Sequence, residues 1–144
     1  MIKKVAILAN GGDVAGFNAV IRGIVKTAEN NDVECYGFID GYNGLLKNEY
    51  VKLSTAEEGN AEGILPKGGS IIGSSTNANV FNYKVVKEDG TVEYQDLSDK
   101  CVQNIKDDGF DCVFTLGGDG TQKSARDFSL KGVNVIGVPK TIDN

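Results

Sequence analysis

The 144-residue sequence contains no histidine, only two arginines and three cysteines. The missing histidine removes the commonest general acid and base, so proton transfer would have to use an aspartate, a glutamate or a lysine. Cys35, Cys101 and Cys112 are odd in number and lack CxxC spacing, which argues against a disulfide framework and a zinc site. A reducing cytoplasm is therefore the expected compartment.

Charge and hydropathy exclude further classes of protein. The net charge of −5 argues against nucleic-acid binding, which needs a basic surface. No apolar run approaches the ~18 residues that a membrane span requires. The apolar N-terminal stretch lacks a cleavage pattern of small residues, so we interpret it as a strand and not as a signal peptide. The length and the 40% hydrophobic content are sufficient for one compact domain over residues 1–144.

Short apolar runs alternate with segments of helical spacing along the chain. Strands are expected at 3–9, 33–38, 68–75, 111–116 and 133–138, and helices from Asn18, at 97–108 and at 121–131. This alternation predicts an α/β fold, a Rossmann-like three-layer α/β/α domain with a mostly parallel sheet. Two alternating runs around Asp89-Gly90, within 83–95, predict an additional small β-hairpin.

Polar and glycine residues mark the expected ends of two of these helices. Ser98 and Thr121 are expected to cap the helix starts, because hydroxyl side chains accept hydrogen bonds from the free N–H groups there. Gly109 and Gly132 are expected to end the same helices, since glycine readily adopts the left-handed conformation that follows a helix.

Nineteen glycines cluster in loops, and three glycine-containing loops follow predicted strands. These are NGGDVAGFN (10–18), LGGDGT (116–121) and GVPKTIDN (137–144). In an open α/β sheet ligands bind at the carboxyl edge of the strands, and the first two loops also open helices that can face an anion. The alternative for each loop alone is a plain turn followed by a helix cap. Neither of the first two loops matches a Walker or a dinucleotide-binding fingerprint.

Two carboxylates in these loops are candidates for chemistry. We favour Asp119, which has glycine on both sides, as a Mg²⁺ ligand, because magnesium is held by one or two carboxylates plus substrate phosphates. A turn or cap carboxylate is the alternative. Asp143 is either a polar loop end or a base that takes a proton from a bound hydroxyl. The functional interpretation requires Asp119 and Asp143 to converge on one crevice at the carboxyl edge.

Together these motifs resemble those of the phosphofructokinase family. GGDVAGFNAVIRG (11–23) is similar to the family's opening motif, GGSIIGSS (68–75) to its second phosphate loop, GGDGT (117–121) to its nucleotide and magnesium loop, and PKTIDN (139–144) to its catalytic loop. The resemblance implies the family's large domain as the fold. It also implies phosphoryl transfer to the 1-hydroxyl of fructose 6-phosphate, forming fructose 1,6-bisphosphate, the committed step of glycolysis.

The resemblance further implies roles for individual residues. The phosphoryl donor would contact Gly12, Gly118, Asp119, Gly120 and Thr121; Asp119 would ligate Mg²⁺; Asp143 would be the catalytic base; and Thr141, Ile142 and Asp143 would line the sugar-phosphate site. Gly120 leaves room for the α-phosphate of ATP, where pyrophosphate-dependent members usually carry a second aspartate. Lys140 points the other way, because a lysine there can stabilise a pyrophosphate leaving group. ATP is the favoured donor and pyrophosphate the alternative.

Two pairs of residues bear on how closely the chain follows this family. Thr76 and Asn77 stand where the family generally supplies an arginine that bridges the donor and sugar phosphates. Arg22 matches, and Lys26 nearly matches, the basic residues with which the allosteric bacterial branch holds a nucleotide effector. A solvated helix face is the alternative for the second pair.

The sequence ends where the family's catalytic loop begins. We therefore expect an N-terminal donor-binding half, with the second half absent, that turns over little by itself and exposes apolar surface where that half docks. The full-length protein is expected to be a homo-oligomer, a dimer or a tetramer. Two other classes remain open: a lipid or NAD kinase that shares the GGDGT motif, and a non-catalytic nucleotide-binding module.

Overall fold

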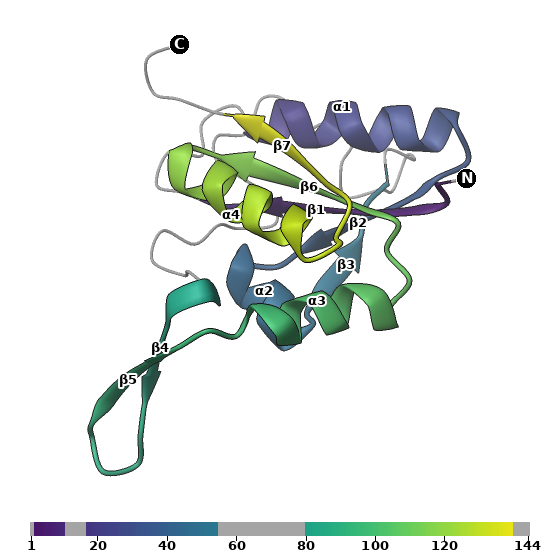
Figure 1. The fold of residues 1–144 in the computed structure, drawn as a ribbon. Coiled ribbons are helices and arrows are strands. Elements are labelled where there is room, and N and C mark those ends of the chain that lie inside the picture. The colour runs from purple at the N-terminus through teal and green to yellow at the C-terminus, as the bar shows by residue number, and fades with distance from the viewer. Residues whose placement is uncertain (1, 11–16, 55–79, 140–144) are drawn as a thin grey trace.

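The computed structural model describes residues 2–10, 17–54 and 80–139, and a five-stranded sheet forms its centre (Figure 1). The elements are β1 (Lys4–Ala9), α1 (Phe17–Asn30), β2 (Glu34–Phe38), α2 (Tyr42–Lys47), β3 (Tyr50–Lys52), the 3-10 turn η1 (Val80–Asn82), β4 (Tyr83–Val86), β5 (Val92–Gln95), α3 (Ser98–Asp107), β6 (Cys112–Gly117), α4 (Asp119–Leu130) and β7 (Val135–Pro139). The strand expected at 68–75 lies outside the described residues.

The order of strands across the central sheet is β3-β2-β1-β6-β7. β1 pairs in parallel with both β2 and β6, and β6 pairs in parallel with β7. Only β3, at one edge, runs antiparallel to its neighbour in this sheet. The predicted mostly parallel sheet is therefore confirmed. The chain leaves β1 toward β2 and β3 and later returns to the other side of β1, which places a topological switch point between β1 and β6.

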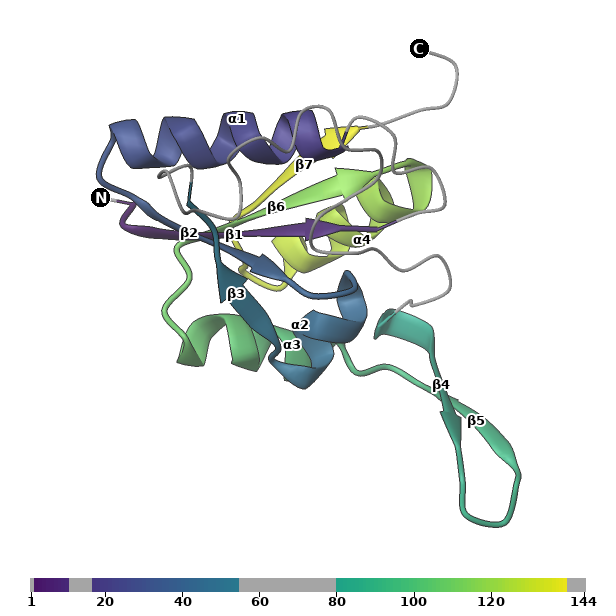
Figure 2. The same ribbon diagram turned by 180° about the vertical axis from the view of Figure 1, so that it is seen from behind.

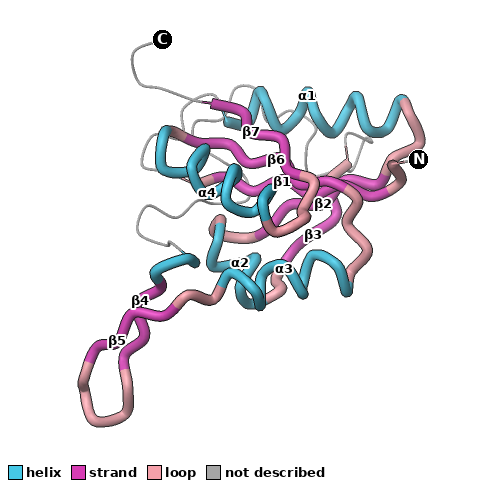
Figure 3. Tube along the Cα trace, in the orientation of Figure 1, coloured by secondary structure: helices cyan, strands magenta, loops and turns pink. Residues whose placement is uncertain are grey.

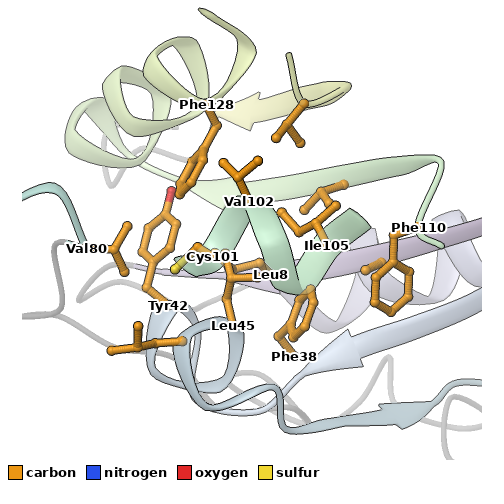
Figure 4. Packing of buried hydrophobic residues seen from close by; sticks show 14 residues of the cluster. Leu8, Phe38, Tyr42, Leu45, Val80, Cys101, Val102, Ile105, Phe110 and Phe128 are labelled. Atoms are coloured by element: carbon orange, nitrogen blue, oxygen red, sulfur yellow. The ribbon is translucent and has the colours of Figure 1, made fainter. Parts of the chain in front are cut away.

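Helices cover both faces of this sheet, as the two opposite views in Figures 1 and 2 show. On one face Ile21 and Val25 of α1 pack in a buried cluster with Val5 and Ile7 of β1. The opposite face carries α2, α3 and α4, whose buried side chains surround Leu8 (Figure 4). This alternation of inward faces along β1 follows from the period of two in a strand. The predicted three-layer α/β/α architecture is confirmed.

The starts of α3 and α4 differ from the predicted ones, and the predicted cap residues do not cap them. Ser98 is the first residue of α3 and not its cap; its main-chain N–H and its Oγ both donate to Asp96 Oδ1, at 3.0 and 2.6 Å. α4 begins at Asp119 after Gly118, two residues before the predicted start at Thr121. The predicted glycine ends are confirmed, since Gly109 and Gly132 have φ values of 73° and 90° and follow α3 and α4 closely.

The predicted hairpin is present as β4 and β5, which project from the body of the molecule (Figure 3). Its turn contains Gly90 at φ 86°, a conformation that glycine adopts without steric cost. Two elements that follow β2 were not predicted, the six-residue α2 and the three-residue β3. α2 contains Gly44, and a β-carbon there would overlap the main chain of Ile39. Glycine is a poor helix former, so it makes the helical pattern of α2 hard to see in the sequence. The closeness of Ile39, and not helix propensity, explains the glycine at position 44.

The three cysteines are free and buried. Burial raises the pKa of the Cys35 and Cys101 thiols to about 12, and it also raises the pKa of the Cys112 thiol. These thiols behave as small apolar core groups, because the reactive form of cysteine is the thiolate. Among the described residues, no helix has the length and apolar character needed to cross a bilayer.

Candidate functional site

Three of the glycine loops begin at one edge of the sheet. β1, β6 and β7 are parallel neighbours, so their carboxyl ends, at Ala9, Gly117 and Pro139, lie together (Figures 1 and 2). Ligands of open α/β sheets bind outside the carboxyl ends of the strands at a topological switch point. The structure therefore places the first residues of the predicted loops at the position where such a sheet binds its ligand.

The start of α4 has main-chain donors at this edge that lack a partner within the helix. The N–H of Gln122 donates to the carbonyl of Gly118 at 3.1 Å and is the first hydrogen bond of the helix. The N–H groups of residues 119–121 precede it and have no partner within the helix. Among the described residues no side chain caps this end, and Gly118 at the cap position is extended. A helix start of this kind attracts an anion through its N–H groups and its dipole.

The side chain of Thr121 does not cap the start of α4. Its hydroxyl donates to the carbonyl of Asn10 at 3.3 Å and accepts from Asn10 Nδ2 at 3.4 Å. Asn10 follows β1, and its own N–H donates to the carbonyl of Leu116 in β6 at 2.9 Å. Thr121 is 3% exposed and Asn10 is 9% exposed, so this link is buried. The prediction that Thr121 caps the helix is wrong because β1 lies close enough to bind its hydroxyl.

Two glycines let the first turn of α4 lie directly against the strand ends. A β-carbon at Gly117 would overlap the carbonyl of Asn10 and the hydroxyl of Thr121, and one at Gly137 would overlap Gln122 Oε1. Gln122 Nε2 in turn donates to the carbonyl of Gly117 at 3.4 Å. Close packing between helix and strand therefore requires glycine at position 117, where the overlap is with main chain, whereas at Gly137 the overlap is with the flexible end of a side chain.

Two buried polar atoms near this edge lack partners within the described part of the chain. They are Oδ1 of Asn10 and Oγ1 of Thr115 on β6. An unsatisfied buried oxygen is costly, on the order of 1–3 kcal/mol. Such atoms in a folded protein call for an explanation, for example a role at a functional site.

The predicted site residues divide into two groups. Gly118, Asp119, Gly120 and Thr121 are consecutive at the start of α4, where the structure describes their main chain. Gly12, Thr76, Asn77, Lys140, Thr141, Ile142 and Asp143 lie outside the described residues. The convergence of Asp119 and Asp143 on one crevice therefore stays a prediction. Sequence analysis missed Asn10; its signal was a polar side chain directly after a buried strand and before a glycine pair.

The described residues offer no metal cage built from protein groups alone. Within the described ranges, no three or more histidine, cysteine, aspartate or glutamate side chains are grouped so that they could hold a metal ion. Mg²⁺ does not need such a cage, because it binds one or two carboxylates together with phosphates and waters. The role of Asp119 as a Mg²⁺ ligand therefore stays a prediction.

The two basic residues on α1 that resemble an effector site lie one helical turn apart. Arg22 is half-buried and Lys26 is exposed. Both the effector site and the solvated helix face accommodate this arrangement, so the allosteric role stays a prediction.

Comparison with known proteins identifies a family and named relatives. The family model described as Phosphofructokinase matches residues 4–144. The chain is 51% identical to ATP-dependent 6-phosphofructokinase 2 of Clostridium perfringens over 144 residues, covering 99% of this chain and 38% of the relative. It is 40% identical to ATP-dependent 6-phosphofructokinase 3 of Bacteroides thetaiotaomicron, covering 98% of this chain and 40% of the relative. The chain thus spans 38–40% of the length of these curated relatives.

Solved structures agree on the fold. Phosphofructokinase of Pichia pastoris in the T-state superposes with a TM-score of 0.80 at 25% identity, covering 100% of this chain and 16% of that one. A pyrophosphate-dependent phosphofructokinase of Marinobacter aquaeolei superposes with a TM-score of 0.72 at 23% identity, covering 99% of this chain and 34% of that one. The second similarity is informative for the fold alone.

Proposed function

The chain belongs to the phosphofructokinase family, and on that premise we propose that it is the donor-binding part of an ATP-dependent 6-phosphofructokinase. The observation that carries the proposal is the position of GGDGT (117–121). It joins the carboxyl end of β6 to the open start of α4, beside the end of β1 and at the switch point of the sheet. The proposed reaction transfers the γ-phosphoryl group of ATP to the 1-hydroxyl of fructose 6-phosphate.

On the donor side, the main chain supplies the first contacts. The free N–H groups of residues 119–121 would bind phosphate oxygens, and the glycines at 117, 118 and 120 leave no β-carbon in the way. Gly12, in the loop after β1, would contact the same donor. Asp119 would hold Mg²⁺, and the ion, when bound, would neutralise negative charge on the donor phosphates.

On the acceptor side, the proposed residues come from the loop after β7. Asp143 would take the proton of the sugar 1-hydroxyl as the phosphoryl group is transferred. Thr141 and Ile142 would line the sugar-phosphate site with it. No histidine is present in the chain, so a carboxylate is the natural base for this step.

The choice of ATP over pyrophosphate rests on two supports. Relatives that are 51% and 40% identical are named as ATP-dependent enzymes. Gly120 leaves space for the α-phosphate, whereas Lys140 would suit pyrophosphate as well. We further propose that the complete enzyme is a cytoplasmic homo-oligomer that binds neither nucleic acid nor membrane.

The test is a phosphoryl-transfer assay on the product of the complete gene. Fructose 6-phosphate is offered with MgATP or with magnesium pyrophosphate, and formation of fructose 1,6-bisphosphate is measured. We expect turnover with ATP to exceed turnover with pyrophosphate. Turnover with neither donor would overturn the proposal, and turnover with pyrophosphate alone would reassign the donor.

Two control substrates distinguish the proposed function from that of the lipid and NAD kinases that share the GGDGT motif. NAD and diacylglycerol are offered with MgATP under the same conditions, and we expect no phosphorylation of either. Nucleotide binding without turnover of any acceptor would instead support a non-catalytic nucleotide-binding module.

A further inference from the structure

Asn10 links the two main-chain segments that flank the proposed donor site. It directly follows β1 and precedes the loop at 11–16, while its partner Thr121 lies in the first turn of α4. The two residues are 111 positions apart in the sequence, and both are buried. Their contact therefore belongs to the tertiary structure and has no counterpart in the local sequence pattern of either segment.

The hydrogen-bond network determines which end of the Asn10 amide faces Thr121. The threonine hydroxyl has one proton, which it donates to the main-chain carbonyl of Asn10 at 3.3 Å. The hydroxyl can then only accept from the asparagine side chain, so the amide must present Nδ2, at 3.4 Å. Oδ1 is thereby left as the buried acceptor without a partner among the described residues.

The start of α4 depends on this link because it has no side-chain cap. The residue at the cap position is Gly118, which has no side chain to accept the first N–H groups. Besides the Asn10 link, Gln122 Nε2 ties the first turn to the carbonyl of Gly117 at 3.4 Å. Gly117 adjoins both contacts, because a β-carbon at this position would overlap Asn10 and Thr121.

We infer that Asn10 is a positioning residue, which holds Thr121 and thereby the open first turn of α4 in place. The N–H groups of residues 119–121 then keep a constant position relative to the end of β1. The positioning is a property of the fold. Its consequence for donor binding rests on the proposed function, because only that function requires phosphate at these N–H groups.

The first experiment measures the positioning without any ligand. Amide hydrogen exchange of the 144-residue chain is compared with that of Asn10→Ala and Thr121→Val, the second of which keeps the side-chain shape. We expect the amides of residues 122–124 to exchange about three- to tenfold faster in both variants, the effect of losing one or two hydrogen bonds. Exchange in the last turn of α4, at 127–130, is expected to stay unchanged.

Two matched variants separate positioning from general loss of stability. Thr121→Ser keeps the hydroxyl and is expected to restore slow exchange at 122–124. Asn104→Ala removes another asparagine amide, whose Nδ2 donates to the carbonyls of Leu45 and Leu46 at 2.9 and 3.2 Å. It is expected to leave exchange at 122–124 unchanged. Unaltered exchange in Thr121→Val, or equal acceleration in Asn104→Ala, would overturn the inference.

The second experiment measures the consequence for the reaction in the product of the complete gene. Asn10→Ala and Thr121→Val are each expected to raise KM for MgATP about three- to tenfold, with a smaller change in KM for fructose 6-phosphate. Their double variant is expected to be little worse than either single variant, because both remove the same link. An unchanged KM for MgATP in an active enzyme would overturn the catalytic consequence. An inactive wild-type enzyme would instead count against the proposed function, while the exchange experiment still decides the positioning.

Discussion

The two ends of the central sheet are built from different kinds of residue. At the amino-terminal ends of β1 and β6, Lys4 and Phe110 pack with Tyr36 of β2 and Tyr50 of β3, and the three aromatic rings meet edge to face. Lys4 Nζ lies 4.7 Å from the Phe110 ring centre and 5.0 Å from that of Tyr36. The carboxyl-terminal end has glycines, the buried Asn10–Thr121 pair and an uncapped helix start. One end buries large apolar groups, and the other brings the main chain to the surface of the site.

The polar groups of Lys3 and Lys4 at the amino-terminal end have partners, whereas Oδ2 of Asp108 is buried without one among the described residues. Lys4 Nζ donates to the carbonyl of Asp108 at 2.7 Å, and the N–H groups of Lys3 and Lys4 donate to Asp111 Oδ2 at 2.8 and 3.0 Å. Cation–π contacts and paired aromatic rings contribute to stability beyond the area they bury. This end therefore closes the sheet and stabilises it.

At the carboxyl-terminal end the described polar groups are only partly paired. Oδ1 of Asn10 has no partner among the described residues. The N–H groups of residues 119–121 have none within α4. A fold that leaves donors and acceptors free at one place gives up stability there and gains a place to bind a charged ligand. On the proposed function, the comparison teaches that stability and binding are assigned to opposite ends of the same strands.

The largest expected effect concerns the carboxyl-terminal end. On the proposed function, Asp143→Asn in the product of the complete gene should reduce kcat about 10²- to 10⁴-fold, because the sugar hydroxyl loses its base. The melting temperature should stay near that of the wild type. Coupled turnover assays and thermal melts check both. A kcat close to the wild-type value would remove Asp143 from the catalytic role.

The next largest effect concerns the opposite end. Phe110→Ala should lower the free energy of unfolding by about 3–5 kcal/mol, because the ring is 7% exposed and contacts three other aromatic rings. Tyr94→Ala is the matched control, since Tyr94 is 60% exposed on the hairpin and its loss should cost less than about 0.5 kcal/mol. Urea denaturation measures both; equal losses in the two variants would contradict the assignment of stability to the amino-terminal end.

Two glycine-to-alanine substitutions, one of them a control, test the close packing at the carboxyl-terminal end. Gly117→Ala should destabilise the chain by about 1–3 kcal/mol, because the new β-carbon overlaps Asn10 and Thr121. Gly23→Ala lies in α1 with no atom within 4 Å of the new β-carbon, and it should stabilise by about 0.5–1 kcal/mol through helix propensity. Opposite signs in urea denaturation support the packing, and a stabilising Gly117→Ala would refute it.

The smallest expected effect is a dependence of stability on pH at the amino-terminal end. The main-chain N–H groups of Lys3 and Lys4 lower the pKa of the Asp111 carboxyl below its ordinary value of 3.8. Because the folded-state pKa is the lower one, this contribution to stability is complete above about pH 4 and is lost as pH falls through the folded-state pKa. Asp111→Asn should thus differ from wild type more at pH 6 than at pH 3. Denaturation curves at the two pH values check this, and an equal difference at both would contradict it.

Much of the fold was predictable from the sequence because it depends on local patterns. Nearly all-apolar runs predicted β1, β2, β6 and β7, and helical spacing predicted α1, α3 and α4, since burial on one or both faces imposes these periods. The glycines at 117 and 118 predicted the end of β6, whereas the loops expected after β1 and β7 lie largely outside the described residues. The short α2 and β3 escaped prediction because each is too short to show a period, and contacts such as that of Gly44 with Ile39 decide them.

The site was predictable as a set of motifs, and its internal connections were not. The sequence by itself determined that Asp119, with glycine on both sides, follows a strand of a mostly parallel sheet, which is enough to predict the carboxyl edge as the place of binding. Only the tertiary structure decided that α4 starts at Asp119 and that the hydroxyl of Thr121 faces Asn10. The physical reason is that a hydroxyl near a helix start binds whichever acceptor the fold brings closest, and here that acceptor comes from a strand 111 residues away in the sequence.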